Sequence, residues 1–122
     1  MKVTLIEFGK MNKNGRVYSY PEVLELPKNT VCTLTHLADK YGNAILTPPI
    51  NGDSTCGTAE ISMDYNGIYA DVNPYSDNRG RMFEELMMNG CKIVPFGTGN
   101  TNENGEISNY ALHYVFLTKD PS

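Results

Sequence analysis

The side chains best suited to chemistry in this 122-residue chain are two histidines and a few hydroxyl groups and thiols. His36 closes a β-branched segment beside a loop-rich stretch, and sites are often built at such strand ends. His113 shares a predicted strand face with apolar residues such as Val115 and Leu117, which favours a packed, hydrogen-bonded role. Nucleophilic catalysis would need a Ser, Thr or Cys held against one of these histidines.

Candidate nucleophiles occur by residue type only, in Ser54, Thr55 and Cys56. No Gly-x-Ser-x-Gly elbow is present. The glycines at residues 97–99 lack the Gly-Lys-Ser/Thr ending of a phosphate-binding loop. No pair of Cys or His has zinc-finger spacing, so we expect no metal and no cofactor. The cysteines are interpreted as small buried apolar residues, at Cys32, Cys56 and Cys91.

Composition narrows the class of protein. Hydrophobic residues make up 40% and charged residues 20%, as in ordinary globular chains, and the length fits one domain over residues 1–122. The net charge of −4 and the absence of a basic run argue against nucleic-acid binding. The apolar stretches are too short to span a bilayer, and residues 1–7 lack the apolar core of a signal peptide. We therefore expect synthesis in the cytoplasm and no membrane partner.

The elements that would position these side chains are mainly strands, predicted at residues 3–8, 31–37, 56–63, 68–72 and 108–118. The Asn-Gly pair at residues 14–15 predicts a tight turn, after which residues 16–18 pair back on the first strand. Residues 64–67 turn between the two central strands. In the final strand, alternation places Tyr110, Leu112, Tyr114 and Phe116 on one face.

One good helix is predicted at residues 78–88, with a cap among residues 76–78 and an Asn-Gly stop after it. Its apolar stripe comprises Met82, Phe83, Leu86 and Met87. Pro21 suits a separate first helical turn.

Two stretches, residues 38–55 and 97–105, are expected to be loops, and Pro95 excludes a central strand position for residues 91–96. Together these elements predict an α+β domain, with an antiparallel sheet or barrel and one main helix.

Several segments, in order, resemble the T-even type of phage prohead protease, the capsid maturation protease of tailed phages. Residues 11–18, followed by Pro21, are similar to its Asn-Asn-Gly-Arg-Tyr signature, and residues 33–36 fall where the family places its catalytic histidine. Residues 57–72 are similar to the family's central hairpin, and residues 79–90 to the helix that follows it. Residues 97–105 are similar to the family's glycine-rich turn. Residues 115–122 are similar to its terminal strand and end, as it does, in Asp-Pro-Ser. The resemblance implies a herpesvirus-protease-like barrel that cuts scaffold and capsid precursors.

The chain departs from that family at the nucleophile. The family's Ser-Ser-Arg-Gly run falls on residues 94–97, which place Val94 and Pro95 where a serine is expected. Neither side chain can attack a carbonyl. The position of a third, acidic residue falls near Phe116, so only His36 remains. We therefore expect a pseudoprotease rather than an enzyme, with Thr98 or Ser54 as the displaced nucleophile if the site is active.

Three functions follow from the resemblance. The first is an auxiliary or decoration protein of the virion, bound to the major capsid protein, with a homo-oligomer on the capsid lattice as a further expectation. The second is an active prohead protease, and the third is a phage protein that binds a host defence factor. Expected partner-binding residues lie in the two loops: Asn51, Asp53, Thr98, Asn100, Asn102 and Asn104.

Overall fold

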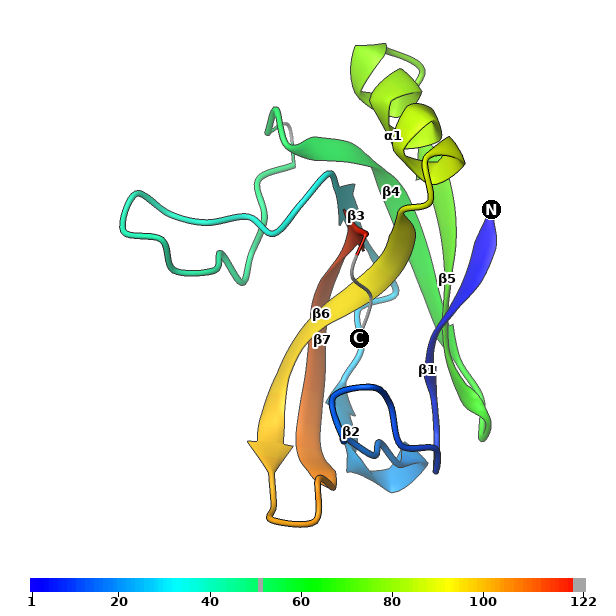
Figure 1. The fold of residues 1–122 in the computed structure, drawn as a ribbon, viewed down its shortest axis with the longest axis vertical. Coiled ribbons are helices and arrows are strands. Elements are labelled where there is room, and N and C mark those ends of the chain that lie inside the picture. Colours follow the sequence, from blue (N-terminus) through cyan, green and yellow to red (C-terminus); the bar gives the residue numbers. More distant parts are fainter. Residues whose placement is uncertain (51, 120–122) are drawn as a thin grey trace.

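A curved, seven-stranded sheet carries most of the core in the computed structural model, which describes residues 1–50 and 52–119 (Figure 1). The strands are β1 (Lys2–Glu7), β2 (Val23–Glu25), β3 (Asn29–Thr33), β4 (Thr55–Met63), β5 (Gly67–Pro74), β6 (Lys92–Thr101) and β7 (Ile107–Thr118). A short 3-10 turn, η1 (Tyr20–Glu22), precedes β2, and α1 (Asn78–Met88) joins β5 to β6. The expected α+β class is therefore confirmed.

The sheet is mixed rather than purely antiparallel. Its order is β1-β5-β4-β3-β7, and β7 also pairs with β2 and with β6. Both β2 and β3 run parallel to β7, whereas the other pairs are antiparallel. Among the described residues β1, β2 and β6 each pair with one strand, so each of them has an unpaired side. The expectation of a wholly antiparallel sheet is wrong, because β7 pairs in parallel with two strands from the N-terminal part of the chain.

The hairpin of β4 and β5 is the most regular part of the sheet, as predicted. Seven residue pairs follow one another without a bulge, from Gly57 opposite Pro74 to Met63 opposite Ile68. Alternate residues are buried, including Ala59, Ile61 and Val72. This period of two matches a strand with one face on the core.

The helix α1 covers the residues predicted for it. The Asp77 side chain accepts a hydrogen bond from the backbone amide of Arg79 at 2.9 Å, which caps the first turn. Phe83 is buried, and Leu86 and Met87 pack against the core. Met82 is half exposed, so the predicted apolar stripe is narrower than expected.

The register of β7 against β6 slips twice. Phe96 lies opposite Tyr114 but the next residue lies opposite Leu112, and a second irregularity follows near Asn109, whose φ is +55°. Each extra residue in β7 reverses which side chains face inward. Tyr110 and Leu112 therefore share the main core with Val115 and Leu117, whereas the Tyr114 and Phe116 side chains join a second cluster. The predicted single aromatic face is wrong.

Two loop predictions also need correction. Residues 16–18 do not pair with β1 itself: Val17 bridges Glu106 instead, and the Arg16 and Tyr18 carbonyls accept hydrogen bonds from Asn12 and Gly9, which follow β1. The stretch at 97–105 is strand up to Thr101, so its loop is confined to the residues that follow. The predicted first helical turn at Pro21 is present as η1, and it leads directly into β2.

The long excursion after β3 forms a projecting arm, defined here as residues 34–50 and 52–54 (Figure 1, cyan to green). Its tip is ordered by the Asp39 carboxylate, which accepts hydrogen bonds from the amides of Tyr41 and Asn43 at 2.8 and 3.0 Å. Ala38 and Ala44 form an antiparallel bridge across it. The expected surface excursion is therefore present, but its tip is an ordered hairpin and not an irregular loop.

Candidate functional site

A cavity of about 330 Å³ lies at the edge of β6, where five segments meet. Its lining comes from β1, the loop after β1, the root of the arm, β6 and β7. Three of the residues are those aligned with protease site positions: His36, Pro95 and Phe116. The loop contributes the polar residues of the N-terminal signature, Asn12, Asn14 and Arg16. Segments far apart in the sequence are thus brought to one place.

His36 lies beyond the end of β3, which stops at Thr33, and not on the strand itself. Its ring centroid is 3.7 Å from that of Phe116 and 5.2 Å from that of Phe96, which it meets edge-on. Desolvation by these neighbours lowers the pKa of His36, favouring the neutral imidazole. No described side chain hydrogen-bonds its ring, whereas a catalytic histidine is held between a nucleophile and an acid.

The second aromatic cluster forms the wall beside His36. It contains the buried residues Val94, Tyr114 and Phe116, with Val31 and Phe96 packed against them. Phe96 stacks on Tyr114 with ring centroids 4.8 Å apart. The Tyr114 hydroxyl is buried and has no hydrogen-bond partner among the described residues. Burial raises the pKa of Tyr114, and the backbone amide of Leu37 opposes that rise.

The two positions aligned with the nucleophile point in different directions. Val94 is buried in the aromatic cluster opposite Phe116, and it does not line the cavity. Pro95 does line the cavity, and its missing N–H is tolerated because β6 is an edge strand. The prediction that Pro95 cannot occupy a central ladder is confirmed. Neither residue offers an atom that could attack a carbonyl.

A hydroxyl and an imidazole do meet elsewhere, on the exposed surface of β6 and β7. Thr98 Oγ1 lies 3.0 Å from Nε2 of His113. Neither residue lines the cavity. The sequence alternation assigned His113 a packed role and missed this pair, because the bulge beside Tyr114 offsets the two strands. No described carboxylate hydrogen-bonds the His113 ring, and Ser54 contacts neither histidine through a hydrogen bond.

The side chains of the expected partner-binding residues differ in their contacts. Asp53, Thr98, Asn100 and Asn104 are exposed, and Thr98 is the one that contacts His113. The Asn102 side chain instead holds its own loop: Oδ1 accepts from the amides of Asn104 and Glu106, and Nδ2 donates to the Glu106 carboxylate. Asn51 and the Asp-Pro-Ser end at residues 120–122 lie outside the described residues.

The cysteines are all buried, as predicted. The Cys56 thiol donates to the Cys32 carbonyl oxygen at 3.4 Å, and hydrogen bonding to Cys56 together with burial raises the pKa of Cys32. That thiol therefore stays protonated. Within the described part of the chain, no three His, Cys, Asp or Glu side chains gather in a way that could hold a metal ion.

Comparisons with protein-family models, curated proteins and solved structures gave no match to this chain. Within residues 1–50 and 52–119, no helix is both long and apolar enough to cross a membrane.

Proposed function

We propose that this chain is a structural protein of a phage virion, an auxiliary or decoration protein on the capsid, built on an inactive prohead-protease domain. The proposal starts from the resemblance in the sequence. One observation carries it further: His36, Pro95 and Phe116, the positions aligned with the protease site, line one cavity together with the Asn-Asn-Arg signature residues. Such convergence of aligned positions is expected of a domain derived from that protease.

The same cavity supports the loss of catalysis. Its histidine packs on an aromatic ring 3.7 Å away, where an acidic residue and a serine would be needed. A domain that keeps such a fold without a nucleophile acts through its surfaces.

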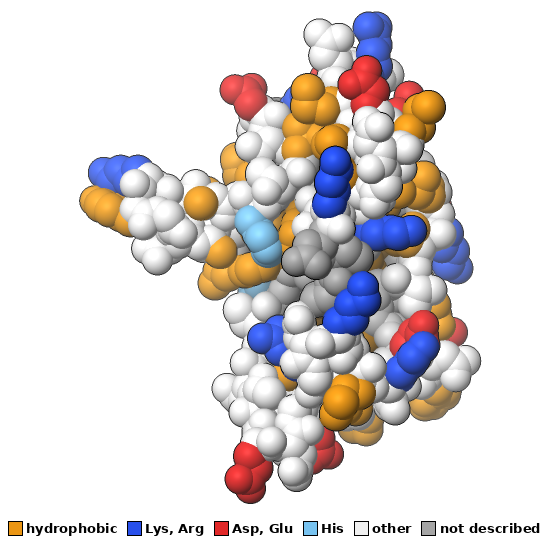
Figure 2. Space-filling view, viewed as in Figure 1, with side chains coloured by type: hydrophobic (Ala, Val, Ile, Leu, Met, Phe, Trp, Pro, Cys, Tyr) orange, Lys and Arg blue, Asp and Glu red, His pale blue; other side chains and the backbone are white. Residues whose placement is uncertain are grey.

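The arm is the surface best suited to a partner, which we propose is the major capsid protein. Tyr41 and Ile50 are 76% and 77% exposed, and Leu46 is also exposed. Figure 2 shows the arm standing away from the body with hydrophobic side chains along it. Ordered hydrophobic residues that face solvent commonly mark protein interaction sites. An arm that is already structured also loses little entropy on binding.

Quantitative mass spectrometry of purified virions tests this proposal. The chain should be present in numbers comparable to those of capsid subunits. A Tyr41→Ser/Ile50→Ser variant should be lost from virions, whereas a Met82→Ser/Met88→Ser variant, changed on the exposed side of α1, should remain. Normal heads formed without the chain, and virions that lack it, would refute the structural role and favour binding to a host factor.

A second candidate function is proteolysis, favoured by the contact of Thr98 with His113 at 3.0 Å. In such a site His113 would accept the hydroxyl proton as Thr98 attacks a peptide carbonyl. Incubation with capsid and scaffold precursors, read by mass spectrometry, decides between the two. We expect no specific cleavage. Cleavage that Thr98→Ala abolishes and the neighbouring exposed substitution Thr101→Ala preserves would establish the protease instead.

A further inference from the structure

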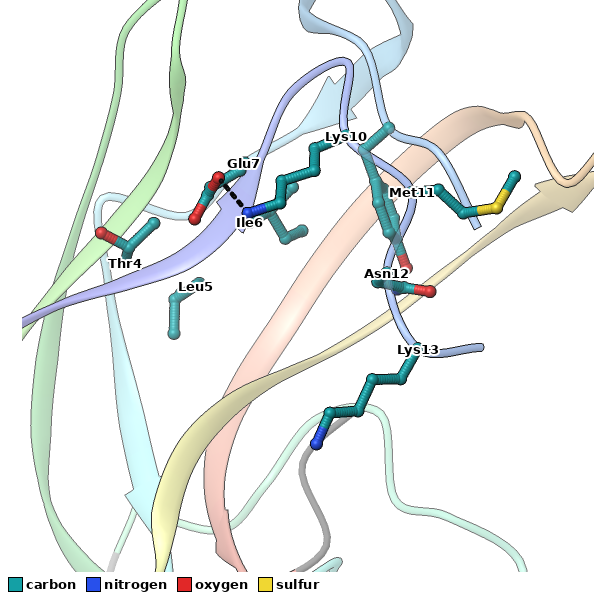
Figure 3. A pocket seen from close by; sticks show the side chains of 9 residues that line it. Thr4, Leu5, Ile6, Glu7, Lys10, Met11, Asn12 and Lys13 are labelled. Carbon is teal, nitrogen blue, oxygen red and sulfur yellow. Dashed lines mark ion pairs between the residues drawn. The ribbon is translucent and has the colours of Figure 1, made fainter. Parts of the chain in front are cut away.

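A second cavity, of about 360 Å³, adjoins the first along β1 (Figure 3). The two share four lining residues, Leu5, Ile6, Asn12 and Tyr18, so together they form one groove. The second cavity extends the groove toward Lys10, Met11 and Lys13, away from the positions aligned with the protease site. We call the combined feature the β1 groove.

The β1 groove carries a surplus of positive charge in an acidic chain. Its cations are Lys10, Lys13 and Arg16, and its one carboxylate is that of Glu7. Figure 3 shows the Lys10 side chain turned back to Glu7, with which it forms an ion pair at 3.4 Å. Lys13 and Arg16 have no carboxylate partner among the described residues. The net charge of the whole chain is −4, so this local excess is not a general property of the surface.

The groove also offers apolar surface and an open strand edge. Leu5 is half-buried, Met11 is exposed beside it, and the core residue Ile6 lies at the floor. Met1 and Val72 exchange hydrogen bonds of 3.0 and 2.8 Å, so by alternation Thr4 directs its N–H and C=O away from β5. Thr4 lines the groove, and no described strand pairs with that side of β1. A free edge of this kind is a template for an added strand.

We propose that the β1 groove binds an extended acidic segment of a partner protein, with glutamate or aspartate alternating with apolar residues. This deepens the proposed function, on which it rests, by naming the chemistry of the partner. Carboxylates would meet Lys13 and Arg16, apolar side chains would cover Leu5 and Met11, and the peptide backbone would pair with Thr4. A nucleic acid fits less well, because three cations are few and the rest of the protein repels phosphate.

Fluorescence anisotropy with two labelled peptides tests this inference on the full chain. The probes are alternating Glu-Val and Lys-Val peptides of about ten residues, long enough to form a strand. The Glu-Val peptide should bind and the Lys-Val peptide should not. In the Lys10→Glu/Lys13→Glu variant, binding of the Glu-Val peptide should weaken about tenfold, which corresponds to about 1.4 kcal/mol. The matched control, Lys28→Glu/Arg81→Glu, changes the net charge equally at exposed positions outside the groove and should retain binding within about twofold.

Several outcomes would overturn the inference: no binding of the Glu-Val peptide at about 1 mM, equal loss in both variants, or tighter binding of an oligothymidylate of the same length. If the Lys10→Glu/Lys13→Glu variant does not fold, Lys13→Ala and Arg16→Ala measured at low and high salt give the same test. The amount of the chain in purified virions distinguishes the groove proposal from the proposed capsid role. If the chain is present in wild-type virions and the groove variant is incorporated equally, the groove proposal fails alone; absence of the unmodified chain refutes the capsid role.

Discussion

His36 is a cavity residue whose surroundings are mainly aromatic. In this cavity the imidazole has an aromatic ring on one side and solvent on the other, because the arm begins where β3 ends. The packing holds the ring against the second aromatic cluster. His36 therefore helps to anchor the root of the arm. Its partial loss of hydrating water lowers the pKa of the imidazole.

We predict that His36 makes the fold less stable in mild acid. Its pKa is lowered in the folded chain, so below about pH 6.5 the unfolded chain takes up this proton more readily. Stability should be complete above that pH and should fall as the pH drops through the folded pKa. Urea midpoints at about pH 7.5 and pH 5.5 measure the slope.

His36→Gln should flatten this slope, and His113→Gln should leave the His36 contribution in place. Identical slopes in the wild-type chain and in His36→Gln would show that the ring titrates as in the unfolded state.

Tyr114 gives a second prediction at this scale. Within the described residues its buried hydroxyl makes no hydrogen bond of ordinary geometry, although the Leu37 amide lies near it, and an unsatisfied buried hydroxyl costs about 1–3 kcal/mol. Tyr114→Phe should therefore leave the free energy of unfolding unchanged or raise it by about 1 kcal/mol. Tyr69→Phe is the control, because it removes a hydroxyl that donates to Asp64 at an exposed site. A loss above about 1 kcal/mol in Tyr114→Phe would reveal a hydrogen bond in solution.

Among the elements, three loops share one construction. Asn12, Asp39 and Asn102 each accept hydrogen bonds from the amides two and four residues later. In each loop the fourth residue is a glycine with positive φ, namely Gly15, Gly42 and Gly105. The printed sequence carries this signal as Asn/Asp-x-x-Gly, which marks a turn closed by its own side chain. The Asn102 side chain is therefore used within its own loop.

We predict that Gly105→Ala is far more damaging than Gly15→Ala. Both glycines have positive φ, so alanine costs about 1–2 kcal/mol at either position. A Cβ at Gly105 would also overlap the Gly15 carbonyl oxygen, because the two loops pack together, whereas the space around a Cβ at Gly15 is open. Urea denaturation should show the larger loss for Gly105→Ala. Equal losses would mean that the loops separate without cost.

The sequence predicted elements better than it predicted their pairing. The helix at 78–88 and the central hairpin carry local signals, a cap at Asp77 and regular alternation, so their bounds were predictable. The faces of β7 were not, because the alternation of its aromatics gives no sign of two bulges. Of the cavity, the sequence indicated only the residues that the resemblance aligns with protease site positions. Its contact with the signature loop depends on Val17 pairing with Glu106, a long-range contact without a local cause.

At the scale of the molecule, the arm is separable from the sheet. Replacing residues 39–43 by a Gly-Gly linker should leave the melting temperature within a few degrees, because those side chains are exposed and the bonds at the tip are local. Circular dichroism on heating measures this. Under the proposed capsid role, the same variant should be missing from purified virions. A collapse of the fold would show instead that the tip stabilises the root around Leu37, which is buried.

The pairing of β7 also has a kinetic consequence. Val23 lies beside Tyr110 and Cys32 beside Val115, so β2 finds its partner and β3 its second partner in the last strand of the sheet. Until β7 docks, β2 has no neighbour in the sheet and β3 has only β4. Loop closure over such separations makes folding slow, and unpaired edges in the waiting chain invite association with other chains. A chain interrupted before residue 107 should therefore aggregate rather than fold, and refolding of the whole chain should slow as protein concentration rises.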